Sequence, residues 1–209
     1  MINGGHQVKK LIINKKVIVM KKFISILLTA ILAISLTGCF SSSNNDNSAN
    51  DTTTNENTEQ NILIAYYSLS GNTKAAAEEI QKQAGGDLVE ITRTEAYPED
   101  FYDLAENEII NHERPAITLS INNIDDYDVI FVGYPIWWQE APAMINTFVH
   151  QFDFADKTVI PFCTSSSDGI EESLDVFDDI QDQATVKEGL RISDYDDIPD
   201  WLDQVLDNN

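Results

Sequence analysis

The sequence predicts an α/β domain built on a doubly wound, five-stranded parallel sheet with the strand order 2-1-3-4-5. Apolar runs of strand length alternate with segments of helical spacing, which is typical of parallel strands joined by helices. The runs at 62–67, 127–134 and 158–164 are almost continuously apolar, as strands buried on both faces are. The roughly 150 residues of 61–209 are enough for one domain with its own core.

The elements are expected to alternate regularly along the domain. The segment 87–93 alternates apolar and polar residues as a strand does, and Pro199 suits the first turn of a closing helix. In such sheets ligands bind beyond the carboxyl ends of the strands, where the strand order switches. The loops after Tyr67, Gly133 and Cys163 are therefore the candidate ligand loops. The expected strands are 62–67, 87–93, 127–134, 158–164 and 185–192, and the expected helices are 73–84, 98–113, 141–152, 169–182 and 198–207.

The start of the chain has the features of an export signal. In MKKFISILLTAILAISLTGC (20–39), two lysines precede an apolar stretch, Phe23–Leu36, that is short for a membrane span of about 20 residues. The final Leu-Thr-Gly-Cys resembles the lipobox of bacterial lipoproteins, in which the cysteine becomes lipidated and N-terminal after cleavage. We therefore expect 1–39 to be a leader and lipoprotein signal peptide, with Met20 as the true start and lipid on Cys39. The alternative is an uncleaved anchor helix.

The next segment, 40–60, is almost entirely polar. Between Ser41 and Gln60 only Ala49 is apolar, so the segment cannot bury enough surface to offset the loss of chain entropy. We expect a disordered polar tether that separates the domain at 61–209 from a membrane.

The chain is strongly acidic. It contains 13 Lys and Arg against 35 Asp and Glu, a net charge of −22. Six of the basic residues and none of the acidic ones precede Cys39, so the remainder has 7 against 35, a net charge of −28. This charge argues against nucleic acid and anionic lipid as partners, and it favours a cationic partner. A merely solvated acidic surface is the alternative.

The loop after the first predicted strand reads SLSGNT (68–73) and leads into a helix. A helix N-terminus offers free N–H groups and partial positive charge, so hydroxyl and amide donors beside it form a phosphate cradle. The motifs GxxxxGK[ST] and GxGxxG are both absent here. The alternative is a plain capped helix, with Ser70 or Asn72 as the cap. The predicted cradle residues are Ser68, Ser70, Gly71, Asn72 and Thr73.

Two further loops reach the same edge of the predicted sheet. In GYPIWWQEAP (133–142), prolines stiffen the loop and the tryptophans can offer a flat face, although at least one of them is expected to pack into the core. In CTSSSDG (163–169), hydroxyls and backbone N–H groups can bind the polar rim of a ring, unless they only cap the next helix. The three loops together predict a planar, aromatic, phosphorylated ligand. The predicted contacts here are Pro135, Ile136, Trp137, Trp138, Thr164, Ser165, Ser166 and Asp168.

The segments YYSLSGNTK, YDVIFVGYPIWW and KTVIPFCTSSSDG together resemble the flavodoxin-like family, in particular its short members that carry a PIWW loop. The resemblance covers roughly 62–192, with the motifs in order. It implies a flavodoxin-like fold and FMN as the cofactor, with the phosphate in Ser68–Thr73 and the isoalloxazine between Pro135–Trp138 and Thr164–Asp168. Unlike many electron carriers of the family, the third loop has no aromatic residue to cover the outer ring face.

FMN would carry the redox chemistry, so no catalytic side chain is expected. We expect an FMN-binding electron-transfer protein or oxidoreductase, lipid-anchored at the extracytoplasmic face of the cell membrane. Its partner would be a redox protein or a quinone, because NAD(P)H is scarce outside the cytoplasm. Two alternatives stay open: an NAD(P)H- or quinone-dependent FMN reductase, and a non-redox lipoprotein module that binds phosphate or flavin.

Other classes fit the residues less well. A receiver domain shares the sheet order but needs an aspartate after the third strand, where this chain has Gly-Tyr (133–134). A metallohydrolase needs clustered histidines, and the three histidines are scattered, so no metal site is expected. Cys163 ends a strand without an evident histidine partner, which favours a buried packing role over catalysis.

Overall fold

The computed structural model describes residues 60–121 and 123–206. The expected leader, the lipid-bearing Cys39 and nearly all of the expected tether lie outside these residues. The main sheet has six strands in the order β2-β1-β5-β6-β7, with β8 also pairing with β6, and every pairing is parallel. This confirms the predicted order 2-1-3-4-5. The strands are β1 (Ile62–Tyr66), β2 (Asp87–Glu90), β5 (Val129–Pro135), β6 (Thr158–Thr164), β7 (Thr185–Val186) and β8 (Leu190–Arg191).

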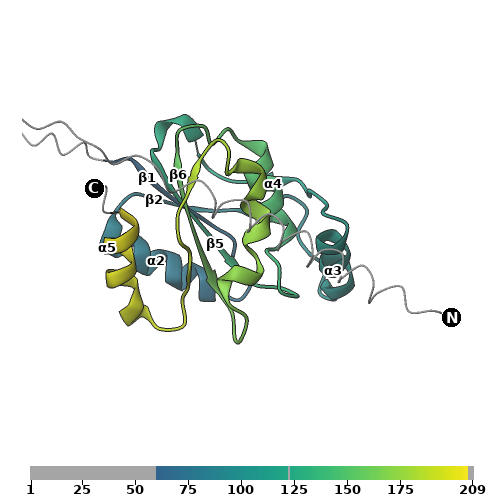
Figure 1. Cartoon of the computed structure of the whole chain (residues 1–209). Helices are drawn as coiled ribbons and strands as arrows, with labels where there is room; N and C mark the ends of the chain where they lie inside the picture. Colours follow the sequence, from purple (N-terminus) through teal and green to yellow (C-terminus); the bar gives the residue numbers. More distant parts are fainter. Residues whose placement is uncertain (1–59, 122, 207–209) are drawn as a thin grey trace, which may run out of the picture. The chain divides into compact units, whose positions relative to one another are not determined.

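Helices cover both faces of this sheet (Figure 1). The α2 and α5 helices lie together on one face, and α3 and α4 lie on the other. Four 3₁₀-helices and a two-stranded antiparallel sheet complete the described part of the chain. The helices are α2 (Asn72–Ala84), α3 (Tyr102–Ile110), α4 (Ala143–Gln151) and α5 (Ile198–Leu206), the 3₁₀-helices are η2 (Ile124–Asp126), η3 (Ile170–Glu172), η4 (Leu174–Ile180) and η5 (Tyr195–Asp197), and the small strands are β3 (Thr92–Arg93) and β4 (Ile117–Thr118).

The central strands are buried on both faces, which explains their continuous apolar sequence. In β1, Leu63 and Ala65 pack on the α4 side, whereas Ile64 and Tyr66 pack on the side of α2 and α5. Successive side chains of a strand point to opposite faces, so two separate cores form. Parallel register then brings the carboxyl ends of β1, β5 and β6 to one edge.

The expected strand at 185–192 is wrong as a single element. The β7 strand pairs with Thr158 and Val159, and β8 pairs with Phe162 and Cys163. Pro161 lies between these two pairings in β6. Proline has no N–H to donate, so the hydrogen-bond ladder breaks opposite it and the chain leaves the sheet between β7 and β8.

The expected helix at 169–182 is also wrong, because this segment forms the 3₁₀-helices η3 and η4. Both the amide and the hydroxyl of Ser173 donate to the carbonyl of Ile170, three residues earlier, each at 3.0 Å. A serine hydroxyl that bonds the local backbone competes with the α-helical pattern. Ser173 is fully buried and also bonds the Tyr134 hydroxyl at 3.2 Å, which fixes the break.

The expected strand at 87–93 divides as well. Its first half pairs with β1 as β2, and its last two residues pair antiparallel with β4 in the small sheet. Fully buried Ile91 lies between the two halves, with its amide donating to the Tyr66 carbonyl at 2.6 Å. The chain therefore leaves the main sheet after β2 and is redirected toward α3.

Cys163 is fully buried at the end of β6, as the expected packing role requires. Burial raises the pKa of its thiol to about 12, against the opposing effect of Arg191. A buried, protonated thiol is a poor nucleophile. Cys163 therefore serves as a core residue at the base of the candidate site.

Candidate functional site

A cavity of about 900 Å³ lies at the carboxyl edge of the main sheet. Residues that follow β1, β5, β6 and β8 line it, so the sheet order brings together segments that are far apart in sequence. Seven of the thirteen predicted binding residues are among them. The lining residues are Ser70, Asn72, Pro135, Ile136, Thr164, Ser165, Ser166, Ile192, Ser193, Asp194, Tyr195 and Asp196. We call this space the edge cavity.

The β1 loop presents a helix N-terminus to the edge cavity. The α2 helix follows Gly71, and no side chain among the described residues caps its first turn by a hydrogen bond. The alternative of a helix capped by Ser70 or Asn72 is therefore wrong. The Ser68 hydroxyl instead accepts from the Gly71 amide at 3.1 Å and shapes the loop. The uncapped N–H groups and the helix dipole favour an anion at this place.

Gly71 has the backbone conformation that the loop requires. Its φ is +91°, in the left-handed region that side chains disfavour, and no atom of the described part of the chain lies within 4 Å of the position of a Cβ. The glycine therefore turns the chain into α2 and leaves open space beside the helix N-terminus.

Thr73 connects two of the loops. Its hydroxyl lies 2.8 Å from the hydroxyl of Thr164, and only 1% of Thr73 is exposed. This hydrogen bond joins the start of α2 to the end of β6. Thr73 therefore holds the β1 and β6 loops together beneath the edge cavity, which it does not line.

The β6 loop is held by its own serine. The Ser165 hydroxyl accepts from the amides of Ser167 and Asp168 at 3.2 and 2.9 Å, and Arg191 donates to the Ser165 carbonyl at 3.4 Å. The Ser165 side chain thus caps this turn. Ser166 is exposed and lines the edge cavity.

The β5 loop contributes an apolar wall. Pro135 and Ile136 line the edge cavity, and the Ile136 amide donates to the Thr164 carbonyl at 3.1 Å. Trp137 packs edge-on against Tyr67, with ring centroids 5.6 Å apart, and lies equally close to Phe101. Trp137 therefore belongs to an aromatic cluster on the α3 side, as expected for one of the two tryptophans.

Trp138 lies on a tight turn beside this wall. Trp137 and Glu140 exchange two backbone hydrogen bonds of 2.9 Å, and the residues between them, Trp138 and Gln139, have φ values of 49° and 67°. Two consecutive positive φ values are unusual for residues other than glycine, and such strain concentrates at functional sites. Trp138 is 43% exposed, and neither tryptophan lines the edge cavity.

A buried group of Glu108, Arg93 and Tyr97 packs against Trp137 through the Tyr97 ring. Glu108 is 2% exposed, accepts from the Tyr97 hydroxyl at 2.6 Å and pairs with Arg93 at 2.9 Å. Burial and the hydrogen bond to Glu108 raise the pKa of Tyr97 well above its usual range, and burial with nearby Glu108 raises that of Tyr67 to about 12. The sequence pattern did not reveal this group, because its members come from β3, α3 and the loop between them.

The fourth side of the edge cavity was also missed. Residues 192–196 follow β8, and their contribution includes two carboxylates and the ring of Tyr195. The predicted strand order could have revealed these residues, because the carboxyl end of the fifth strand lies at the same edge of the sheet as that of the fourth. None of the residues that line the cavity is Lys or Arg.

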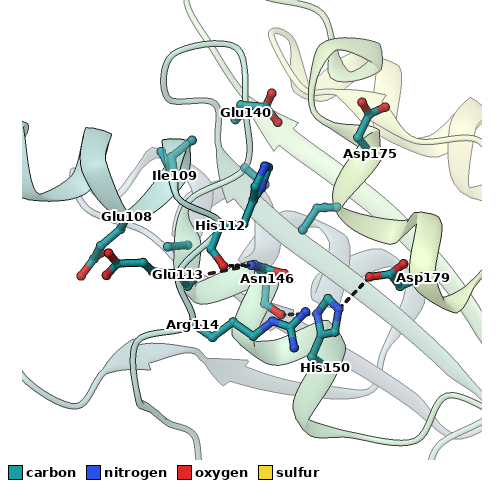
Figure 2. A pocket seen from close by; sticks show the side chains of 13 residues that line it. Glu108, Ile109, His112, Glu113, Arg114, Glu140, Asn146, His150, Asp175 and Asp179 are labelled. Atoms are coloured by element: carbon teal, nitrogen blue, oxygen red, sulfur yellow. Dashed lines mark hydrogen bonds and ion pairs between the residues drawn. The ribbon is translucent and has the colours of Figure 1, made fainter. Parts of the chain in front are cut away.

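A second, smaller cavity of about 180 Å³ lies between the end of α3, α4 and η4 (Figure 2). His150 bonds Asp179 at 2.9 Å, and the Asn146 amide donates to the carbonyls of His112 and Glu113. This space holds none of the predicted binding residues, and its acidic lining disfavours a phosphate. Its carboxylates are Glu108, Glu113, Glu140, Asp175 and Asp179.

Residues 60–121 and 123–206 contain neither a membrane-spanning helix nor a cluster of metal ligands. No helix among them has the length and apolar character needed to cross a bilayer. No three of their His, Cys, Asp and Glu side chains gather in a way that could hold a metal ion.

A doubly wound sheet with a ligand-sized cavity at the switch in strand order defines an α/β ligand-binding protein. The family model described as Flavodoxin matches residues 61–205, and the chain belongs to the flavodoxin family. A flavodoxin from Haemophilus influenzae is 30% identical over 122 residues, which are 56% of this chain and 58% of that relative. The chain thus matches less than two thirds of that relative's length.

Solved structures support the same fold. A candidate flavoprotein from Bacteroides eggerthii is 38% identical with a TM-score of 0.64, and the match covers 71% of this chain and 99% of that one. A flavoprotein from Lactobacillus acidophilus, solved in complex with FMN, is 28% identical with a TM-score of 0.59, covering 68% and 98%. The flavodoxin-like fold expected from the sequence is confirmed.

Proposed function

We propose that this protein binds FMN in the edge cavity and transfers electrons. The observation that carries the proposal is the edge cavity itself, which joins an uncapped helix N-terminus to an apolar wall and a hydroxyl-bearing rim. These are the three kinds of surface that a flavin mononucleotide needs. The relative from Lactobacillus acidophilus that was solved with FMN supports the same cofactor.

The residues present fit the phosphate of FMN. Ser70 and Asn72 supply a hydroxyl and an amide at the cavity, beside the free N–H groups of the first turn of α2. Gly71 leaves the adjoining space open, since a Cβ there would meet no atom within 4 Å. Neutral donors and a helix dipole would thus hold the phosphate without a lysine or arginine in the cavity lining.

The residues also fit a flat ring. Pro135 and Ile136 provide an apolar surface, and Thr164 and Ser166 provide polar groups at its margin. The hydrogen bond from the Ile136 amide to the Thr164 carbonyl keeps the β5 and β6 loops in a fixed relation. A cavity of about 900 Å³ lies within the usual range of roughly 300–1,000 Å³ for cofactor sites.

Bound FMN supplies the redox chemistry, because its ring accepts and returns electrons. The described side chains then have binding and positioning roles. Thr73 and Thr164 lock two loops together, and Trp137, supported by Tyr97 and Glu108, fixes the β5 loop.

The partner we propose is a redox protein with a basic docking face, or a membrane quinone. The chain after Cys39 carries 7 basic against 35 acidic residues, and Asp194 and Asp196 line the cavity. Attraction between opposite charges speeds the encounter of two proteins, and this attraction weakens as added salt screens the charges.

A redox assay tests the proposed function. The full chain, loaded with FMN and reduced by dithionite without oxygen, is mixed with oxidised cytochrome c, a basic one-electron acceptor. We expect electron transfer whose rate falls as salt is added. Electron transfer from free reduced FMN to the same acceptor is the control. A loaded chain that returns no electrons contradicts the redox function, and a salt-independent rate contradicts the basic partner.

We also propose that a lipid on Cys39 holds the domain at the extracytoplasmic face of the membrane. The motif Leu-Thr-Gly-Cys after an apolar stretch supports this placement, and the acidic domain would not adsorb to anionic lipid by itself. We expect the chain in the membrane fraction of a bacterial host, labelled by palmitate. Cys39→Ala should abolish the labelling, and a Cys163→Ala variant should retain it. Palmitate-free wild-type protein would contradict the proposal.

A further inference from the structure

Tyr195 is the one aromatic residue among those that line the edge cavity. It lies in η5 and is 46% exposed. Within the part of the chain that the structure describes, its ring makes no aromatic contact and its hydroxyl makes no hydrogen bond. Among the described residues, a large aromatic side chain is thus placed at the cavity with neither an aromatic nor a hydrogen-bonding partner.

The segment that carries Tyr195 is fixed at both ends. The Ile192 amide donates to the Cys163 carbonyl at 2.8 Å, which ties the end of β8 to β6. On the other side, Ile198 is fully buried at the start of α5. Between them the Asp194 carboxylate accepts from the Asp196 amide at 3.1 Å and closes the η5 turn. Tyr195 is therefore held at the cavity by the backbone, while its ring is about half exposed.

The β6 loop cannot supply such a ring. Residues 164–168 contain only Thr, Ser and Asp side chains, and both tryptophans of the β5 loop lie outside the cavity lining. Among the described residues, Tyr195 is thus the aromatic side chain placed to stack on a planar ligand in the edge cavity. Stacking of a flat ring on an aromatic side chain is favourable for any flat ring.

We propose that Tyr195 covers one face of the flavin ring. The covering aromatic residue then comes from the segment after β8 and not from the loop after β6. This inference rests on the proposed FMN function and assigns a binding residue to that same site. Because Tyr195 would contact the ring and not the phosphate, it should matter equally for FMN and for riboflavin, which lacks the phosphate.

The test titrates the full chain with FMN and with riboflavin, followed by flavin fluorescence. For Tyr195→Ala we expect the dissociation constants of both flavins to rise about tenfold, with weaker quenching of the bound flavin. Tyr195→Phe keeps the ring and should bind both flavins as the wild type does. Tyr102→Ala removes a more exposed tyrosine, at 66%, from α3, which does not line the edge cavity, and should change neither constant.

Two further measurements separate loss of ring stacking from loss of stability and from a change at the phosphate site. Among the described residues Tyr195 contacts no other aromatic ring, so Tyr195→Ala should unfold at the same urea concentration as the wild type. Inorganic phosphate should compete with FMN equally well in the variant and in the wild type. Unchanged flavin binding in Tyr195→Ala overturns the inference and leaves the proposed function intact. Loss that affects FMN but not riboflavin, or an equal loss in Tyr195→Phe, also overturns it. A wild-type chain that binds neither flavin overturns the proposed function and this inference together.

Discussion

Replacing Ser70 by glutamate is expected to weaken FMN binding roughly 100-fold or more, since two like charges about 4 Å apart repel by several kcal/mol near a protein surface. Ser70 lines the edge cavity beside the uncapped N-terminus of α2, where we place the phosphate. Its side chain is exposed, so the substitution should not disturb the fold. Quenching of FMN fluorescence on titration measures the effect.

Ser120→Glu is the matched control. It makes the same change at an exposed serine that does not line the edge cavity, so it separates local repulsion from the effect of one more negative charge. Riboflavin affinity should fall much less than FMN affinity in Ser70→Glu. Equal loss of both flavins, or equal loss in the two glutamate variants, would contradict a phosphate site at the start of α2.

The second large effect is expected from Gly133→Ala, which should lower the free energy of unfolding by about 1–3 kcal/mol. Gly133 lies in β5 between Tyr66 of β1 and Phe162 of β6 in the register of the sheet. A Cβ at Gly133 would overlap the ring of Phe162, which is fully buried. The glycine therefore makes room for a large ring at the base of the edge cavity. Urea unfolding of the variant and the wild type gives the difference.

A rescue experiment identifies the cause of this destabilisation. Phe162→Leu by itself should destabilise the protein by opening a cavity, but combined with Gly133→Ala it should restore part of the lost stability. The free energy of unfolding of the double variant is then higher than the sum of the single effects implies. Simple additivity would show that the overlap with Phe162 is not what Gly133 avoids.

The central sheet could be predicted because its strands are buried on both faces. In β1, β5 and β6 this burial leaves continuous apolar runs that the sequence displays directly. The edges of the fold were harder to predict. The break between β7 and β8 follows from Pro161 in the neighbouring strand, so no pattern within 185–192 could announce it. The 3₁₀ geometry of 170–180 depends on the buried bonds of Ser173 to Tyr134 and Ile170.

The candidate site was partly predictable for a similar reason. The carboxyl ends of three neighbouring parallel strands must meet at one edge, and Ser70, Pro135 and Thr164, at or just after those ends, do line one cavity. The sequence could not determine which way a tryptophan faces, and Trp137 packs with the α3-side aromatic cluster. The sequence did not predict Tyr195 as a site residue, because it lies among aspartates, which are typical of a solvated surface.

The most direct test of the central claim is the visible spectrum of the purified full chain after mixing with FMN and removing the unbound flavin. We expect a yellow protein that retains about one FMN per chain in the edge cavity, and that loses it when Ser70 is replaced by glutamate. A colourless wild-type protein that also fails to quench FMN fluorescence would contradict FMN binding by this chain. A protein that stays equally yellow in Ser70→Glu would place the FMN outside the edge cavity.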